Sequence, residues 1–249
     1  MLNPDLQKGR RFLRDTIRQD IDFGRTDQVI GVTHPPVQKS CPDNLPRIVL
    51  PRKKEFAKFI EADIVTLINR RRSHRHYTDM PLTLTELAFL LWATQGISLD
   101  RRPHSLRTVP SAGARHPFET YICVQGVSDL EEGLYRYLPL DHALVNMRCA
   151  DLRTELVVGT MGQSFVSQAA VVFVWTAIPH RAEWRYGAAA HKTIAIDAGH
   201  VCQNLYLACG AINAGTCAIA AYDQTRMDAL LNVDGEDEFT IYMAPVGKI

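Results

Sequence analysis

The chain has 249 residues, of which 46% are hydrophobic and 22% are charged, a balance typical of globular proteins. Its formal net charge of +1 gives no reason to expect nucleic acid as a partner, because that role usually demands a clearly basic domain. The longest apolar run, residues 169–178, is too short to span a bilayer and predicts a buried strand, so we expect no membrane association.

The N-terminal residues and the cysteines favour the cytoplasm. The first residues carry basic and acidic side chains without an apolar core, so they do not form a secretory signal. The six cysteines are scattered and include no C-x-x-C pair. That pattern suits reduced thiols in a cytoplasmic protein better than a disulfide framework or a zinc site, and we expect no metal.

The chain divides into an arm and one larger domain. Residues 1–60 are charged and rich in proline, which predicts an extended arm with one short helix. A helix is expected over residues 61–70. A second helix follows, in which Thr83 and Glu86 form a capping box at the start and Gly96 marks the end.

The rest of the domain, which we place at residues 61–249, combines strands with a long helix. Because these elements lack the regular β-α-β alternation, the predicted fold class is α+β. The apolar patterns predict strands at residues 119–124, 133–138, 169–178 and 238–248 and a helix at residues 192–210.

The stretch NRRRSHRHY makes a candidate phosphate site just beyond the first predicted helix. Arg71, Arg72 and Arg75 surround Ser73, and guanidinium groups bind phosphate oxygens bidentately. A solvated basic face is the alternative interpretation of such a charge run.

The stretch TVPSAGARHP, residues 108–117, predicts a tight turn. Gly113 lets the backbone approach a ligand closely, and free N–H groups suit an anion or a planar polar ring. An ordinary surface loop is the alternative. Ser111 lies in P-S-A-G-A rather than G-x-S-x-G, so a nucleophile elbow is not expected. Gly247 and Lys248 predict a second basic contact for a phosphate, and a charged C-terminal tail is the alternative interpretation.

Tyr186 directly follows Arg185. A tyrosine beside an arginine can donate or accept a proton, because the neighbouring charge tunes its basicity. A packing role is equally open. No G-x-G-x-x-G motif follows a strand and no P-loop motif occurs, so neither a Rossmann dinucleotide site nor a P-loop hydrolase is expected.

Several segments occur in the order found in nitroreductase-like flavoenzymes: RRSHRHY, LLWATQGI, RTVPSAGARHPFETYICV, GLYRY, DAGHVCQNLYLA and PVGK. From about residue 60 onward, the chain resembles the SagB-type dehydrogenases of that family, the group that includes the azoline oxidases of peptide-modifying systems. The resemblance implies a nitroreductase-type sandwich, with a mixed antiparallel sheet flanked by helices, in an intertwined homodimer. It also implies one FMN per subunit, bound at the dimer interface.

The resemblance assigns the FMN contacts to four segments. The R-x-S-x-R segment and the closing Gly-Lys pair would hold the phosphate, with the former also at the flavin edge. The P-S-x-G turn would line the flavin, often from the partner subunit, and a late backbone segment would donate N–H groups near flavin N5. The residues so implied are Arg71, Arg72, Ser73, Arg75, Pro110, Ser111, Ala112, Gly113, Ala218, Ile219, Ala220, Gly247 and Lys248.

The activity implied is that of an FMN-dependent oxidoreductase. A reduced nicotinamide, NADH or NADPH, or an organic donor would deliver hydride to flavin N5. The electrons would then pass to a small acceptor, such as a nitroaromatic or a quinone, or to a tailoring substrate. A flavin- or nucleotide-binding module without turnover is the alternative function.

Two departures from the group's pattern concern the chemistry. Azoline oxidases carry a Lys-Tyr pair that assists proton removal, and here the candidate catalytic pair reads Arg185-Tyr186. Because arginine stays protonated, it cannot replace lysine as a base, although it can polarise Tyr186. Ala220 and Ala221 stand where the group often has glycines.

Overall fold

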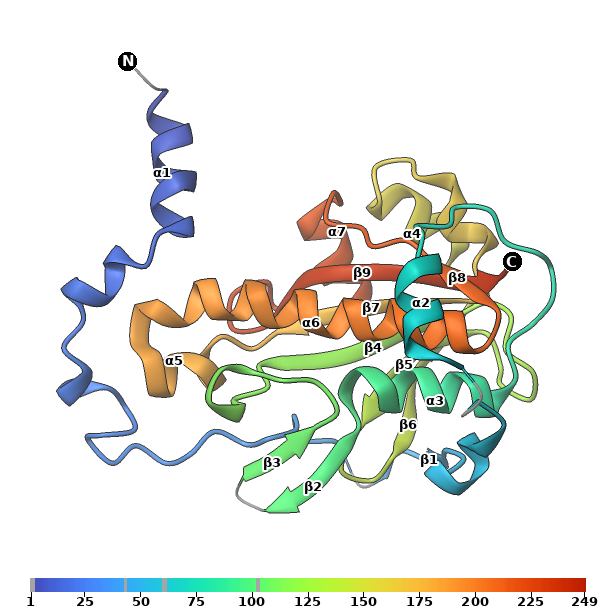
Figure 1. Cartoon of the computed structure of the whole chain (residues 1–249), viewed down its shortest axis with the longest axis horizontal. Helices are drawn as coiled ribbons and strands as arrows, with labels where there is room; N and C mark the ends of the chain where they lie inside the picture. The colour runs from blue at the N-terminus through green and yellow to red at the C-terminus, as the bar shows by residue number, and fades with distance from the viewer. Residues whose placement is uncertain (1–2, 43, 60–61, 102–103) are drawn as a thin grey trace.

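The computed structural model describes residues 3–42, 44–59, 62–101 and 104–249. Within these ranges the centre of the molecule is a seven-stranded sheet in which all neighbouring strands are antiparallel (Figure 1). A separate hairpin pairs β2 (Ile97–Arg101) with β3 (His104–Arg107). Across the main sheet the strands are β1 (Arg47–Val49), β6 (Ala143–Cys149), β5 (Gly133–Leu138), β4 (Phe118–Val124), β7 (Val171–Ala177), β9 (Phe239–Lys248) and β8 (Ala214–Thr216).

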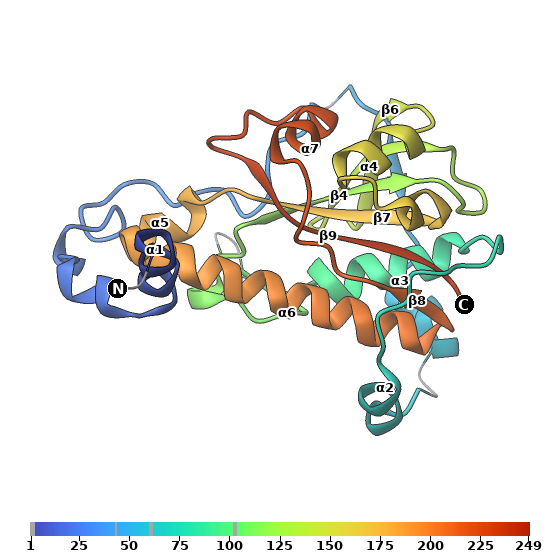
Figure 2. The same ribbon diagram turned by 90° about the horizontal axis from the view of Figure 1, so that it is seen from above.

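Helices cover both faces of the sheet. Figure 2 shows α3 and α6 on one side of the central strands and α4 and α7 on the other. None of the described helices is long and apolar enough to cross a membrane. The α-helices of the described chain are α1 (Pro4–Leu13), α2 (Ile64–Arg70), α3 (Leu84–Gln95), α4 (Arg153–Gly159), α5 (His180–Tyr186), α6 (Ala190–Ala211) and α7 (Gln224–Leu231).

The central strands divide their side chains between two hydrophobic cores. In β4, Ile122 and Val124 join the core that includes residues of α3 and α6, whereas Tyr121 and Cys123 join the core that includes residues of α4 and α7. Successive side chains of a strand point to opposite faces, so every residue of β4 and β7 is buried. These layers confirm the predicted α+β sandwich.

The predicted helix boundaries follow from side-chain caps. Thr83 Oγ1 accepts a hydrogen bond from Glu86 N at 3.2 Å, and the Glu86 carboxylate accepts one from Thr83 N at 2.9 Å, so the predicted capping box of α3 is confirmed. Gly96 ends that helix, with its N–H bonded to Trp92 O. The helix predicted over residues 61–70 begins at Ile64, because Asp63 is its N-cap; residue 61 lies outside the described residues.

The four predicted strands correspond to β4, β5, β7 and β9, whereas β1, β6 and β8 were not predicted. Both β1 and β8 have only three residues, too few for a periodic pattern. β1 lies inside the predicted arm and pairs with β6, so the arm enters the main sheet.

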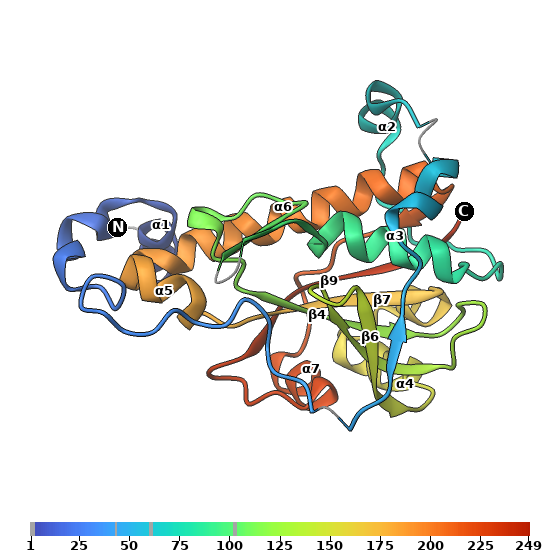
Figure 3. The same cartoon turned by 90° about the horizontal axis from the view of Figure 1, so that it is seen from below.

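The arm runs along one end of the molecule before it reaches the sheet. None of the residues of α1 is buried, and the helix projects away from the body in Figure 1. Figure 3 shows the blue chain passing α5 and reaching the edge of the sheet next to β6. At α5, Trp184 Nε1 donates to Val32 O and Gln28 N donates to Trp184 O, both at 2.8 Å.

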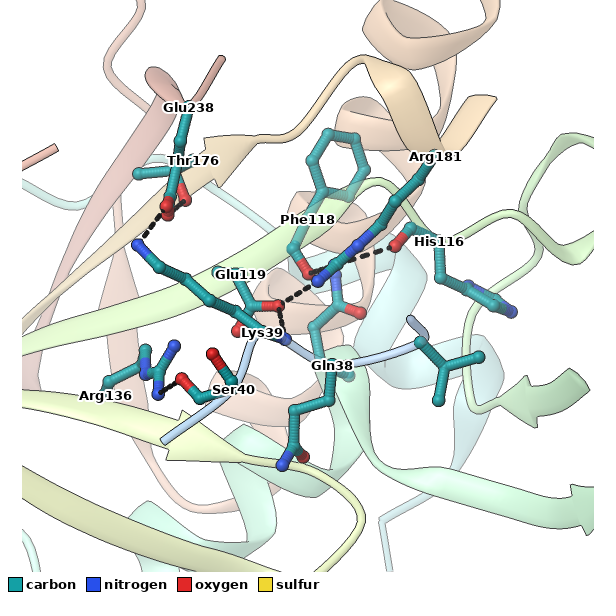
Figure 4. Close-up of polar contacts among 12 residues, drawn as sticks. Gln38, Lys39, Ser40, His116, Phe118, Glu119, Arg136, Thr176, Arg181 and Glu238 are labelled. Carbon is teal, nitrogen blue, oxygen red and sulfur yellow. Dashed lines mark hydrogen bonds and ion pairs between the residues drawn. The ribbon is translucent and has the colours of Figure 1, made fainter. Parts of the chain in front are cut away.

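Buried polar side chains hold the arm around Lys39 and Ser40 (Figure 4). Glu119 accepts a hydrogen bond from Lys39 N at 2.8 Å, and Arg136 donates to Ser40 O at 2.7 Å. Glu119 also forms an ion pair with Arg181 of α5, and both side chains are almost fully buried. The Glu119 carboxylate of β4 therefore binds both the arm and α5.

Candidate functional site

The predicted phosphate segment lies beside Tyr206 of α6. Ser73 Oγ and Tyr206 Oη are 2.9 Å apart, and the Arg71 guanidinium lies 5.3 Å from the centre of the Tyr206 ring. Tyr206 Oη also accepts a hydrogen bond from Ala218 N at 2.9 Å. A backbone bridge between Ser73 and Thr216 fixes the segment against β8. Arg71 and Ser73 of the predicted phosphate segment and Ala218 of the late backbone segment thus meet at Tyr206.

A cavity of about 280 Å³ opens at this point. Arg70, Arg71 and Arg72 line it together with Tyr206, and its described lining residues include no aspartate or glutamate. Arg72 is held by hydrogen bonds from Nη1 to the carbonyl oxygens of Asn69 and Arg71, at 3.0 and 2.8 Å. A concentration of guanidinium groups without carboxylates favours an anion such as phosphate.

Two paired glycines let the basic segment lie against the end of the sheet. Gly215 of β8 and Gly247 of β9 face each other. A Cβ on Gly215 would lie 2.6 Å from His74 Cβ, and one on Gly247 would lie 2.7 Å from the Tyr77 ring. Both distances are below any real Cβ contact, so the observed packing requires glycine at both positions.

Lys248 has a different partner from the one that the resemblance implies. Its Nζ donates to Glu86 Oε1 and to Ile212 O, both at 2.7 Å, and both charged side chains are largely buried. Burial opposes ionisation of Glu86, but the hydrogen bond from Lys248 and those at Thr83 outweigh it, so the pKa of this carboxyl is lowered. In this arrangement the Lys248 ammonium joins β9 to α3.

The late segment 218–220 and Arg75 lie near the same end of the sheet. The Arg75 guanidinium lies 6.0 Å from the Phe165 ring centre. Ile219 N donates to Met243 O at 2.8 Å, and Ala218 N donates to Tyr206. Two of the three backbone N–H groups that the resemblance assigns to the flavin therefore have partners within the chain.

The tight turn has left-handed backbone at three positions. The φ angles are 56° at Gly113, 53° at Ala114 and 45° at His116. Left-handed conformations cost energy for residues other than glycine and persist where the surroundings hold them. The tight turn predicted from the sequence is therefore present, with left-handed backbone at two positions besides the glycine.

Asp197 of α6 holds this turn. Its Oδ2 accepts hydrogen bonds from Ser111 Oγ at 2.7 Å and from Ala112 N at 3.0 Å. Ser111 Oγ in turn accepts one from His116 N at 2.9 Å. Burial raises the pKa of the Asp197 carboxyl, although these hydrogen bonds oppose the shift. A single buried carboxylate therefore fixes both the side chain and the backbone of the turn.

Arg185 and Tyr186, at the end of α5, pack against Gly113. A Cβ on Gly113 would overlap the Tyr186 hydroxyl and lie 3.2 Å from Arg185 Nε. The Arg185 guanidinium lies 5.5 Å from the centre of the Tyr186 ring. The structure thus brings the predicted catalytic pair and the predicted turn together.

Helix α6 separates these two clusters within one chain. Tyr206 contacts the phosphate segment and Asp197 holds the turn, and they are nine positions apart in the helix. At 1.5 Å and 100° per residue, that spacing places them about 13.5 Å apart along the axis and on opposite faces. Figure 1 shows α2 near one end of α6 and α5 at the other. The phosphate segment and the turn of one chain do not meet.

The sequence matches the Nitroreductase family over residues 68–248. The chain belongs to the nitroreductase family. MJ1384 of Methanocaldococcus jannaschii, which carries a nitroreductase name, is 32% identical over 188 residues, 76% of this chain and 92% of that protein. Nitroreductases are commonly flavin-dependent, so in general terms the chain is a flavin oxidoreductase.

Solved structures place the nitroreductase fold over most of the chain. A protein of Anabaena variabilis with a nitroreductase name superposes with a TM-score of 0.69 at 29% identity over 85% of this chain. This chain spans 43% of that protein. The Escherichia coli microcin synthetase complex McbBCD gives a TM-score of 0.60 at 18% identity, covering 85% of both chains, which is a likeness of fold.

Sequence reasoning on this nitroreductase missed Asp197 and Tyr206 as site residues. Both lie in the segment DAGHVCQNLYLA, which predicted only a helix and a family resemblance. Asp197 offered a signal, because it falls between Ile194 and Val201 on the apolar face of α6, where a charged residue needs a partner. Tyr206 offered none, because a tyrosine on a half-buried helix face is common.

Proposed function

We propose that the chain is an FMN-dependent oxidoreductase whose flavin sites are each assembled from two copies of the chain. One copy would supply the basic segment around Arg71 and Ser73, and the other would supply the turn at Gly113 with Tyr186. The observation that carries the proposal is the placement of these two clusters on opposite faces of α6, since a ligand that contacts both then needs a second chain.

The residues at the basic cavity fit a phosphorylated cofactor. Arg71 and Arg72 present guanidinium groups to it, and Ser73 adds a hydroxyl beside them. FMN, when bound, supplies a ring that accepts and releases hydride at N5. Arg75, a permanent cation, would stabilise negative charge at the pyrimidine edge of the ring. Lys248 would add to the phosphate site only if its bond to Glu86 were broken.

The turn and the catalytic pair would form the reacting side of the site. Gly113 keeps the backbone free of a side chain where a flat ring must approach. The Tyr186 hydroxyl lies against Gly113, and we assign it the transfer of a proton to or from the substrate. The Arg185 guanidinium lies over the ring of Tyr186 and orients it.

The donor would be NADH, NADPH or an organic molecule. The acceptor would be a nitroaromatic, a quinone or a tailoring substrate. The fold of the microcin synthetase complex, which was solved with truncated pro-MccB17 bound, supports the last class by analogy of fold alone.

The first test is the absorption spectrum of the purified protein, followed by anaerobic addition of NADPH and then NADH. Flavin bands that bleach and return on addition of a quinone are the expected result. Flavin bands that neither nicotinamide bleaches would favour an organic donor or the alternative, a binding module without turnover. A colourless protein that takes up no added FMN would contradict the proposal.

The second test asks whether two chains share one site. Arg71→Ala and Gly113→Val should each abolish flavin-dependent turnover. In a co-expressed mixture, half of the dimers would be mixed, and each would hold one intact site, so about a quarter of the wild-type activity should return. Recovery of no activity would show that each chain builds its own site.

A further inference from the structure

Two arginines lie against the turn at Gly113, Arg115 from the turn itself and Arg185 from α5. Arg115 Nε donates to Gly113 O at 3.1 Å. A Cβ on Gly113 would lie 3.2 Å from Arg185 Nε. The two guanidinium groups therefore flank one residue, and the Tyr186 hydroxyl lies on the same residue.

Arg115 is fixed in place by its surroundings. Its guanidinium lies 5.2 Å from the centre of the Trp184 ring, and Nη1 is 2.7 Å from His34 Nε2. The residue is buried, and burial, followed by the positive charge of Arg185, lowers the pKa of this guanidinium. The two guanidinium groups thus lie close enough for their positive charges to interact.

Arg185 is exposed and differs from Arg115 in its partners. It contacts the face of the Tyr186 ring and forms no ion pair with any carboxylate in the described part of the chain. Anion binding is most favourable at an exposed guanidinium next to a like charge, because the anion offsets the repulsion and accepts two parallel hydrogen bonds.

We propose that Arg185, supported by Arg115, binds a carboxylate or phosphate group of the molecule that reacts at this site. Tyr186 would then stand beside the bound anion, where its hydroxyl can reach the reacting part of the same molecule. This inference rests on the proposed function for the identity of the reaction, but the anion site itself is formed by one chain. An anion-binding role would account for an arginine at the position where the azoline oxidases carry a lysine.

Two sources could supply such an anion. It could belong to the acceptor or tailoring substrate, as a carboxylate or phosphate on the molecule that takes the electrons. It could equally be a phosphate of a nicotinamide dinucleotide. The shared chemistry is a bidentate oxyanion, and the experiment separates the two sources.

Binding is tested first, without turnover, on the purified protein with its native cofactor content. Trp184, against which Arg115 lies, is the fluorescent reporter. Benzoate and phenyl phosphate are titrated at constant ionic strength, with benzamide as the uncharged control. We expect both anions to bind at least about tenfold more tightly than benzamide, the effect of one charge-assisted hydrogen bond.

Variants assign that preference to Arg185. Arg185→Gln should remove the preference, and Arg185→Lys should retain part of it. Arg226→Gln on α7, an exposed arginine paired with Asp223 at the N-cap of that helix, should leave the preference unchanged. Unaltered benzoate binding in Arg185→Gln would overturn the proposal. Trp184→Phe should abolish the signal, and calorimetry then replaces fluorescence as the readout.

Kinetics identify the source of the anion. If the acceptor carries it, Arg185→Gln should lower the ratio of kcat/KM for 4-nitrobenzoate over 4-nitrobenzamide by about tenfold. If the nicotinamide carries it, the KM for NADH or NADPH should rise instead.

Anion binding that depends on Arg185 in a protein without flavin turnover would refute the proposed function and leave the anion site standing. An equal effect on 4-nitrobenzoate and 4-nitrobenzamide, with an unchanged nicotinamide KM, would overturn the anion site.

Discussion

Replacement of Asp197 by alanine should destabilise the turn and the protein together. Two donors, Ser111 Oγ and Ala112 N, lose a carboxylate acceptor, and each such hydrogen bond contributes about 1.5–3 kcal/mol. Burial has raised the pKa of Asp197, so removal of the ionised group also relieves a desolvation cost. We expect a net loss of about 2 kcal/mol in the free energy of unfolding.

The assay is urea denaturation followed by circular dichroism, at one protein concentration, because association shifts apparent stability. In a thermal scan the same loss should lower Tm by about 4–8 °C for a chain of this size. Asp197→Asn should lose less, because an amide oxygen in the place of Oδ2 can still accept both hydrogen bonds, although without the negative charge that strengthens them.

The matched control is Asp141→Ala. That carboxylate pairs with Arg47 at 3.0 Å, but both side chains are well exposed, so the loss should stay near 0.5 kcal/mol or below. Asp197→Ala that unfolds within 0.5 kcal/mol of the wild-type free energy, or that loses no more than Asp141→Ala, would refute the idea that this carboxylate holds the turn.

Three further predictions concern the scaffold around the site. Arg181→Ala should cost about 3–5 kcal/mol in urea denaturation, because it leaves Glu119 charged and buried; a loss below 1 kcal/mol would mean that water enters this site. Thr83→Ala should cost about 1 kcal/mol in the same assay through loss of the capping box, and an unchanged midpoint would count against that cap. Burial, followed by the charges of Arg107 and other nearby arginines, lowers the pKa of His116 to about 3 from 6.5, so stability is full above pH 6.5 and falls as pH drops toward 3, by about 1.4 kcal/mol per pH unit. His116→Gln should flatten this part of the stability–pH curve relative to the wild type, and parallel curves would disprove the assignment.

Elements with a strong local signal were predictable from the sequence, whereas β1, β6 and β8 were not. The apolar run of β7 and the capping box of α3 are local signals that tertiary contacts do not override. β1 depends on its partner β6 for its existence, so no local pattern predicts it. The partnership of Lys248 with Glu86 joins residues 162 positions apart and is likewise invisible in the sequence.

The site was predictable in part for the same reason. The small residues around Gly113 predict a turn without knowledge of its neighbours, because their backbone preferences are local. The carboxylate that holds that turn belongs to Asp197, which lies 86 positions from Ser111. The separation of the two clusters by α6 follows only from the packed helix, so motif spacing alone could not place them on opposite faces of it.

The place of β9 in the sheet constrains how the protein is made. This strand lies between β7 and β8, and it pairs with β7 over most of its length and with β8 over its last three residues. During synthesis, the edge of β7 therefore stays unpaired until residues 239–248 have left the ribosome, and an unpaired apolar edge is a site of aggregation. Stop codons or frameshifts shortly before residue 239 should yield insoluble chains, and slow translation of this last stretch should increase the demand for chaperones.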